Sequence, residues 1–341
     1  MGERGSWGPS RAAREGPRAA LPTITVVVPV KSEARRIARC LAALRSQTLP
    51  PDEIVVVDGR STDATVEIAK RFGVRVFFED YHTRAGANQV GLQEARGELV
   101  AFTDADCIPD PRWLERLAGG FSAEVVGVGG RIENEGETFW QRAIDAALDT
   151  IVGSANSVQG RPFSERRFVS SISGCNSIYR RRDLLDVGGF RTDLVTTEDT
   201  ELNRRMLERG KLLYVPDAVV HHRHERGLRD FARRMFQYGV GRGQSLLPGP
   251  PLVVAFGLPF LAALTLLRPD YAGVLLVLYG VVLLGSAVGP SLRERDPRLL
   301  GALPLVFVIE HAAYALGFWR GLVRRRAPSA PGPVGTRGDP E

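Results

Sequence analysis

The chain has 341 residues, enough for one large domain or two smaller ones, and 44% of them are hydrophobic. Its 45 basic and 39 acidic residues give a net charge of +6, which suits an anionic membrane surface or a phosphorylated substrate. We expect no nucleic-acid partner, because no basic run is interleaved with aromatic residues. The three cysteines fit neither a zinc spacing nor a disulfide framework, which favours a reducing, cytosolic setting for the soluble part.

Both ends of the chain have compositions typical of disorder. Residues 1–21 contain several arginines with glycine and proline but no apolar stretch like that of a signal peptide, so we expect a disordered basic leader. Residues 323–341 are rich in proline and glycine, and we expect a disordered tail.

The first ordered part alternates apolar, β-branched runs with helical patterns. Strands are predicted at residues 24–30, 53–58, 75–78 and 98–103. Between them we expect a helix capped by Ser32 and further helices at 62–72 and 85–96. Continuously apolar strands that alternate with helices predict an α/β fold, with a mostly parallel, Rossmann-like sheet covered by helices on both faces.

Acidic residues stand where these strands end, at the edge where ligands of such sheets bind. Asp104-Ala105-Asp106 ends the fourth strand, and Pro29 and Asp58 lie at the ends of the first two. Two carboxylates beside a buried strand are costly to desolvate unless a charge offsets them. A divalent cation, Mg²⁺ or Mn²⁺, that holds a diphosphate would do so. A solvated turn is the alternative for such a pair alone, and the convergence at one edge favours the binding site.

The second half of the soluble part is predicted in less detail. We expect a strand at 125–130, a helix at 139–151 that packs across the open side of the sheet, and a helix that opens near Glu198 and Asp199. A last strand at 212–215 precedes His221, His222 and His224. The arginine-rich segment 226–248 resembles an amphipathic interface helix, which could hold a lipid headgroup or the leaving diphosphate, or simply carry membrane-surface charge.

Residues 249–322 form the predicted membrane region, with two or three helices. Two apolar segments, 251–267 and 271–289, are near the roughly 20 residues that span a bilayer, and their short link predicts a hairpin. The third segment, 299–318, contains Glu310 and His311, so it is either a third span or an interface helix. Arginines flank both of its ends and both favour the cytosol, a conflict that a re-entrant or interfacial segment would resolve.

Six motifs along residues 22–225 resemble an inverting family 2 glycosyltransferase of the GT-A fold, of the membrane-anchored bacterial type. In chain order they are Val28-Pro29-Val30-Lys31-Ser32-Glu33, Val57-Asp58-Gly59-Arg60-Ser61-Thr62-Asp63, Arg84-Ala85-Gly86-Ala87-Asn88, Asp104-Ala105-Asp106, Val187-Gly188-Gly189-Phe190 and Glu198-Asp199. The family often has asparagine at the position of Ser32, and Asp-Asp-Gly-Ser where this chain has Asp58-Gly59-Arg60-Ser61.

The resemblance implies a role for each matching residue. Asp199 would be the general base, or else an N-cap. Asp58 would accept from uracil, or hold a turn, and Glu33 would accept from ribose, or favour its helix start. The implied donor-binding residues are Pro29, Val30, Glu33, Asp58, Arg84, Asp104 and Ala105; the metal ligands are Asp104, Asp106 and His222, with His224 as the next candidate; the acceptor region contains Asn176 and Glu198.

The implied reaction is metal-dependent transfer of a sugar from a nucleotide sugar, most simply a UDP-sugar, to a hydroxyl of a glycan or lipid. The resemblance places the protein in the cytoplasmic (inner) membrane as a multi-pass protein with a cytosolic catalytic domain. A polyprenyl-phosphate sugar synthase is the alternative, whose anionic acceptor needs no base, so that Glu198 and Asp199 would only orient it. A dinucleotide-dependent oxidoreductase is disfavoured because Gly-x-Gly-x-x-Gly does not follow the first strand. A non-catalytic membrane subunit is disfavoured by the intact acidic residues.

Overall fold

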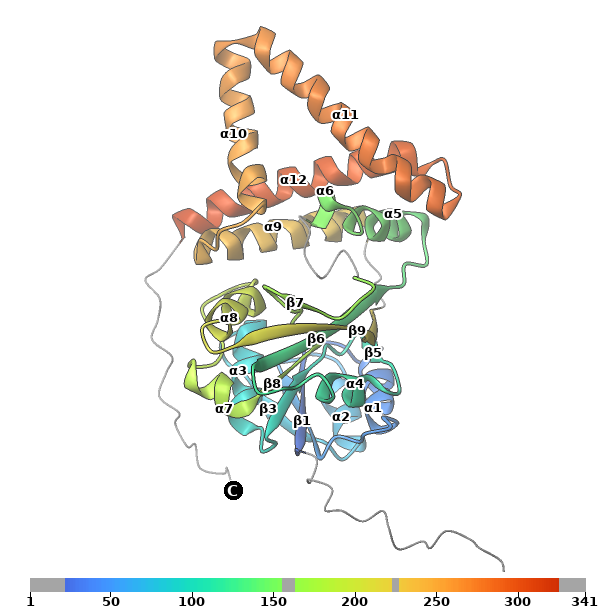
Figure 1. Cartoon of the computed structure of the whole chain (residues 1–341), viewed down its shortest axis with the longest axis vertical. Coiled ribbons are helices and arrows are strands. Elements are labelled where there is room, and N and C mark those ends of the chain that lie inside the picture. Colours follow the sequence, from blue (N-terminus) through green and yellow to red (C-terminus); the bar gives the residue numbers. More distant parts are fainter. Residues whose placement is uncertain (1–21, 155–162, 223–226, 325–341) are drawn as a thin grey trace, which may run out of the picture.

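The computed structural model describes residues 22–154, 163–222 and 227–324 and is shown in Figure 1. Two layers are visible: a sheet with its covering helices, and a group of helices beyond one end of that sheet (Figure 1). The predicted leader, most of the predicted tail and His224 lie outside the described residues.

The first half of the sheet is parallel, as predicted. Its strands run in the order β3-β2-β1-β4, and each pair is parallel. Their bounds are β1 Ile24–Val30, β2 Glu53–Asp58, β3 Arg75–Phe78 and β4 Leu99–Phe102. Pro29 pairs with Val57 and Val30 with Asp58, so the ends of β1 and β2 are level.

The second half of the sheet mixes strand directions. β8 (Ser177–Arg180) is antiparallel to both β4 and β6 (Val125–Asn134), and β9 (Lys211–His222) is parallel to β6. β5 (Cys107–Pro109) and β7 (Arg167–Val169) pair antiparallel with β9. Both β6 and β9 are longer than predicted. His221 and His222 are therefore strand residues, held in register against β5 and β6, rather than part of a following loop.

Helices cover both faces of the sheet, and each face has its own buried core. One core contains residues of α1 (Ile37–Arg45), α2 (Thr65–Arg71) and α4 (Trp113–Ala118). The other contains residues of α3 (Arg84–Glu94), α7 (Arg181–Asp186) and α8 (Glu198–Met206). Strand alternation explains the division, because neighbouring side chains of β1 point to opposite faces.

The predicted start of the first helix is wrong. Ser32 does not cap it: the residue has a left-handed backbone with φ of 55°, and α1 begins five residues later, at Ile37. The Ser32 main-chain N–H donates to the Ser61 hydroxyl over 2.7 Å, so this segment forms a turn that joins the ends of β1 and β2. The serine therefore shapes the edge of the sheet instead of the helix.

The predicted position of the helix near residue 139 is also wrong. α5 (Phe139–Leu148) does not cover the sheet but packs against α9 (Leu228–Ser245), α11 (Pro269–Glu294) and α12 (Leu299–Val323). Its buried alanines and Ile144 join a third core with apolar residues of those helices. The short α6 (Ile151–Ser154) lies in the same layer (Figure 1). The sequence predicted this helix, but the partners of its apolar face come from the last part of the chain, beginning at α9.

α9 and α12 lie side by side in close backbone contact (Figure 1). A side chain at Gly317 would collide with the carbonyl of Phe236, and one at Gly239 would collide with the carbonyl of Tyr314. Small residues are what allow helices to approach so closely. Between the two helices the chain forms the predicted hairpin of α10 (Pro251–Leu267) and α11, which projects away from the sheet. By length and apolar composition α11 and α12 could each cross a membrane.

Candidate active site

The predicted acidic residues gather at one edge of the sheet, where β4 ends and α3 and α8 begin. The first group centres on Asp104. Arg84, in the first turn of α3, places its Nη2 atom 2.7 Å from Asp104 Oδ1, and its Nε atom lies 3.6 Å from Glu198 Oε1. One guanidinium therefore touches a carboxylate from each side of the site. Burial raises the pKa of Asp104 and the neighbouring Asp106 adds to this, whereas Arg84 opposes it.

The second group joins Asp106 to His222. The antiparallel pairing of β5 with β9 sets Cys107 opposite His222, which brings His222 Nε2 to 3.2 Å from Asp106 Oδ2. The other ring nitrogen, Nδ1, lies 3.0 Å from Asn134 Oδ1. If Nδ1 donates its hydrogen to Asn134, Nε2 turns a lone pair toward the Asp106 carboxylate, and a cation shared by the two atoms would suit this arrangement. Such a second partner for the ring is the arrangement that orients histidine ligands of metal ions.

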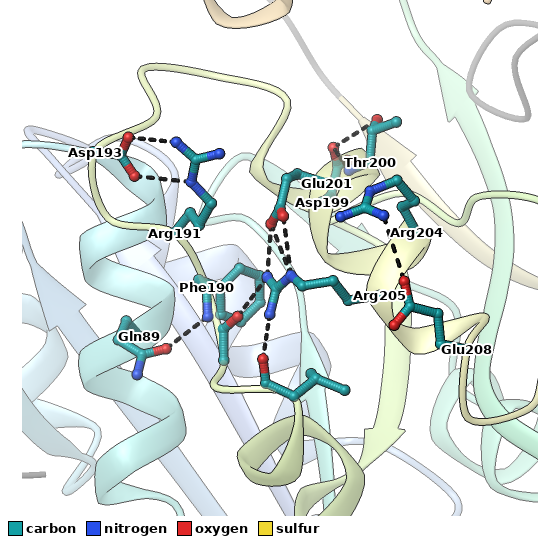
Figure 2. Close-up of polar contacts among 12 residues, drawn as sticks. Gln89, Phe190, Arg191, Asp193, Asp199, Thr200, Glu201, Arg204, Arg205 and Glu208 are labelled. Carbon is teal, nitrogen blue, oxygen red and sulfur yellow. Dashed lines mark hydrogen bonds and ion pairs between the residues drawn. The ribbon is translucent and has the colours of Figure 1, made fainter. Parts of the chain in front are cut away.

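The third group is the start of α8, shown in Figure 2. Asp199 Oδ2 accepts from the Gly174 N–H over 3.0 Å, and its Oδ1 accepts from the Thr200 N–H over 2.6 Å. Glu198 has a side chain that is only 5% exposed. Burial raises the pKa of Glu198 to about 7, although Arg84 acts in the opposite direction. The residue before them, Thr197, has φ of 65°, an unusual left-handed backbone for a β-branched residue.

A clamp that sequence reasoning missed holds α8 in place (Figure 2). Arg205 Nη2 lies 2.6 Å from Glu201 Oε2 and donates to the Gly189 carbonyl over 2.7 Å, and its Nη1 donates to the Val187 carbonyl over 2.6 Å. The Phe190 N–H in turn donates to Gln89 Oε1 on α3 over 2.7 Å. The Val187-Gly188-Gly189-Phe190 motif thus supplies the main-chain carbonyls that hold α8 through Arg205. The spacing of Glu201 and Arg205, one helical turn apart, was the signal available in the sequence.

α9 touches the segment that leads into α8. The Thr196 hydroxyl donates to the Gln237 carbonyl over 2.9 Å. Gly241 lies so close to Thr196 that an added side chain would collide with its main chain and hydroxyl. Burial raises the pKa of Asp104, and the charge of Arg234, also on α9, is among those that oppose this rise. α9, which forms most of the predicted interface segment, therefore contacts the site at Thr196, just before α8.

The predicted base-binding residues lie along the ends of β1 and β2. Asp58 is buried, its Oδ2 accepts from the Ser61 N–H over 2.9 Å, and its Oδ1 accepts from the Ser61 hydroxyl. The Val30 carbonyl accepts from the Gly59 N–H over 2.8 Å. Glu33 Oε2 lies 2.7 Å from Arg36 Nε. Burial raises the pKa of Glu33, Arg36 opposes this rise, and the charges of Asp104 and Asp106 add to it. Ala105 is buried between those aspartates.

Asn176 is not available to an acceptor through its side chain. It is fully buried, its Nδ2 donates to the carbonyls of Arg131 and Ala218 over 2.7 and 2.9 Å, and its Oδ1 accepts from Trp113 Nε1 over 2.8 Å. All three bonds reach residues at least 42 positions away in the chain. The side chain therefore has a structural role that the local sequence could not show, and a place for Asn176 in the acceptor region stays a prediction.

The comparisons with known proteins agree with this geometry. Residues 25–188 match the family described as glycosyl transferase family 2. Glycosyltransferase AglE of Haloferax volcanii is 30% identical over 234 residues, which cover 66% of this chain and 74% of that protein. A Methanococcus voltae protein named dolichyl N-acetyl-alpha-D-glucosaminyl phosphate 3-beta-D-2,3-diacetamido-2,3-dideoxy-beta-D-glucuronosyltransferase is 22% identical over 321 residues, 88% of this chain and 97% of that one.

Among solved structures, the mannosyltransferase PcManGT from Pyrobaculum calidifontis, in complex with GDP-Man and Mn²⁺, has the same fold. Its TM-score is 0.55 at 21% identity, with 85% of this chain and 88% of that chain covered. The fold and site define a glycosyltransferase of the GT-A fold that acts on nucleotide sugars. The chain belongs to glycosyltransferase family 2.

Proposed function

We propose that this protein transfers a sugar, with inversion, from a UDP-sugar to a hydroxyl of a lipid-linked glycan at the cytosolic face of the cytoplasmic membrane. The main support is Arg84, whose guanidinium contacts Asp104 at the end of β4 and Glu198 at the start of α8, next to Asp199. Because one guanidinium contacts both carboxylates, the groups that contain Asp104 and Glu198 lie close enough to act on one reacting bond.

Asp104, Asp106 and His222 fit a divalent cation, Mg²⁺ or Mn²⁺. Two carboxylates and an imidazole are donors that such cations accept, and the second ring nitrogen of His222 is already held by Asn134. When bound, the cation would stabilise the negative charge that develops on the nucleoside diphosphate leaving group. The protein's own contribution is to bury the Asp104 carboxyl, which raises its pKa, with Asp106 close beside it, so that a bound cation would offset the cost of the negative charge.

Asp199 is the proposed general base. Its carboxylate is fixed by the Gly174 N–H, so it can be held ready for the hydroxyl proton of the acceptor as the anomeric carbon is attacked. Glu198 is better suited to position Arg84, because its buried carboxyl faces that guanidinium. In this scheme Asp199 acts on the acceptor and Glu198 acts on the donor through Arg84.

For the nucleotide, uracil remains our prediction. Both carboxylate oxygens of Asp58 accept hydrogen bonds from Ser61. Each oxygen retains a lone pair that could accept the imide N–H of uracil. Pro29 and Val30, level with the end of β2, would supply backbone for the base and Glu33 would face the ribose.

The helical layer supports a membrane-bound, lipid-linked acceptor. Large apolar side chains of α10 and α11 are exposed along the hairpin, among them Phe260, Leu266, Val277 and Val281. α12 lies along α9 instead of continuing the hairpin, which is the interfacial arrangement that would keep both arginine-flanked ends of α12 on the cytosolic side (Figure 1). The name of the Methanococcus voltae relative describes transfer to a sugar on dolichyl phosphate, which is both a lipid and a hydroxyl acceptor.

The test is a panel of nucleotide sugars, assayed for release of nucleoside diphosphate by the full-length protein in detergent. Each sugar is tried with Mn²⁺ or a chelator and with or without lipid extract. We expect release from one UDP-sugar, dependent on both the cation and the extract. Release from GDP-sugars alone would contradict the uracil prediction, and release that is unchanged by chelator would contradict the metal site.

A further inference from the structure

All three cysteines of the chain lie against the Asp104–Asp106 segment. The Cys40 thiol donates to the Asp104 carbonyl over 3.4 Å, and the Cys107 thiol lies 3.9 Å from Asp106 Oδ1. Cys175 Sγ is 3.3 Å from the Ser173 hydroxyl. All three thiols are buried and none is in a disulfide. Three cysteines spread over the sequence are therefore all close to the acidic pair, and Cys107 and Cys175 are also close to each other.

Two of these thiols belong to compact sets of possible metal ligands. Asp104, Cys107 and Cys175 place one carboxylate oxygen and two sulfurs within 4.8 Å of one another. Asp106, Cys107 and His222 place an oxygen, a sulfur and a ring nitrogen within the same limit. Cys107 is common to both sets, and the carboxylate of each set belongs to the Asp104–Asp106 pair.

We propose that Cys107 and Cys175, with the Asp104–Asp106 carboxylates and His222, form a second, softer site that binds a thiophilic divalent cation such as Zn²⁺ or Cd²⁺. Thiolate, imidazole and carboxylate are the ligands that zinc takes in proteins, and thiolates select it over harder cations. An O/N/S site also binds zinc more tightly than manganese in the general order of divalent affinities. The cation replaces the thiol protons, which are released to solvent, so each thiolate formed balances one positive charge of the ion.

The two kinds of cation are expected to compete for the site. Asp104, Asp106 and His222 would each be a ligand in both arrangements, so the cation that binds the thiols takes these ligands from the other. A bound thiophilic cation is therefore expected to displace Mn²⁺. The expected binding of Cd²⁺ by the thiols does not depend on the proposed function. Only the expected loss of sugar transfer rests on the proposed function.

The direct test is a titration of the reduced full-length protein in detergent with Cd²⁺. Binding is monitored through the ultraviolet charge-transfer band of cadmium thiolates. We expect a saturable band in the wild type, loss of at least half of it in Cys107→Ser, and its complete loss in the Cys107→Ser/Cys175→Ser double variant. Cys40→Ser is the matched control, because Cys40 is equally buried but belongs to neither ligand set, and it should keep the whole band. Absence of a band in the wild type, or an unchanged band in Cys107→Ser, would overturn the proposal.

A second measurement needs no variant. Mn²⁺ is bound first in the presence of UDP, and its free concentration is followed by electron paramagnetic resonance as Zn²⁺ is added. Release of the bound Mn²⁺ at about one equivalent of Zn²⁺ supports the shared site, and retention of Mn²⁺ at saturating Zn²⁺ overturns it. If Mn²⁺ does not bind at all, the proposed catalytic site fails, while the cadmium band still decides whether the thiol site exists.

Discussion

Two pairs of acidic residues meet at this site, and they are held by different parts of the molecule. Asp104 and Asp106 leave a parallel strand, and their neighbours Arg84 and His222 come from the sheet domain itself. Glu198 and Asp199 open a helix after a strained Thr197, and the chain just before them is gripped by α9. The first pair depends on sheet register, the second on contact with the helical layer.

This difference suggests a division of labour. Donor binding should tolerate changes in α9, because the sheet residues that hold Asp104 and Asp106 would be unmoved. Sugar transfer should respond to such changes, because Asp199 would shift relative to the acceptor. A variant in one pair therefore leaves the other pair as an internal standard.

The largest effect is expected from Asp106→Asn. The amide removes one negative ligand and the partner of His222, so affinity for UDP in the presence of Mn²⁺ should fall to the level seen with chelator. Isothermal titration calorimetry measures both values. Glu124→Gln is the control, because Glu124 pairs only with Lys211 at 2.8 Å among the ion pairs described and is far from the acidic pair in the fold. A variant that keeps its metal-dependent affinity would remove Asp106 from the metal site.

Asp199→Asn should separate donor binding from chemistry. Loss of a general base typically lowers the rate ~10²–10⁴-fold, whereas the donor affinity should stay near the wild-type value. Single-turnover transfer and the dissociation constant of the donor give the two numbers. A phosphate acceptor would need no base, so a mild loss of rate would favour the polyprenyl-phosphate alternative. Loss of donor binding would instead assign Asp199 to the donor side.

Gly241→Ala tests the grip of α9 on the acceptor pair. The new methyl group would collide with Thr196 and push apart α9 and the entry to α8. Small displacements of catalytic groups lower rates steeply, and we expect a loss of about 10–100-fold in transfer with unchanged binding of UDP and Mn²⁺. Gly273→Ala on α11 is the control, since nothing lies within 4 Å of a methyl group there. Equal losses in donor affinity and rate would contradict the division between the two pairs.

The sequence predicted the donor side better than the acceptor side, for a physical reason. The first four strands are continuous β-branched runs, and their carboxyl ends must share an edge in a parallel sheet, so Asp58 and Asp104 could be placed from local patterns. The structural role of Asn176 could not be predicted, because its three partners lie far away in the chain. His222 was expected after a strand, and only the pairing of β5 with β9 shows how it meets Asp106.

The helical layer shows the same limit. The sequence predicted a helix where α5 lies, but not that its apolar face packs on helices that begin 80 or more residues later. The glycines that let α9 and α12 touch were not singled out, because a glycine in an apolar helix has no local signature of its partner. Long-range contact of this kind is decided by the whole fold.

The smallest effect, and the sharpest test of Glu198, is in the pH dependence of stability. Burial raises the pKa of Glu198 from an ordinary 4.5 to about 7, so the folded state holds this proton more tightly than the unfolded state. The stabilisation is complete below pH 4.5 and is lost as the pH rises through about 7. Between about pH 6 and about pH 8 the wild type should lose about 1 kcal/mol of unfolding free energy from this group.

Glu198→Gln should remove that loss, because the neutral amide cannot ionise. Urea unfolding in detergent, followed by tryptophan fluorescence at the two pH values, measures the difference between variant and wild type. Glu208→Gln is the matched control: Glu208 is exposed and pairs with Arg204 on the surface, so this variant should keep the pH dependence of the wild type. If Glu198→Gln loses stability in parallel with the wild type, Glu198 is already ionised at the lower pH. Its carboxylate would then be a permanently charged partner of Arg84.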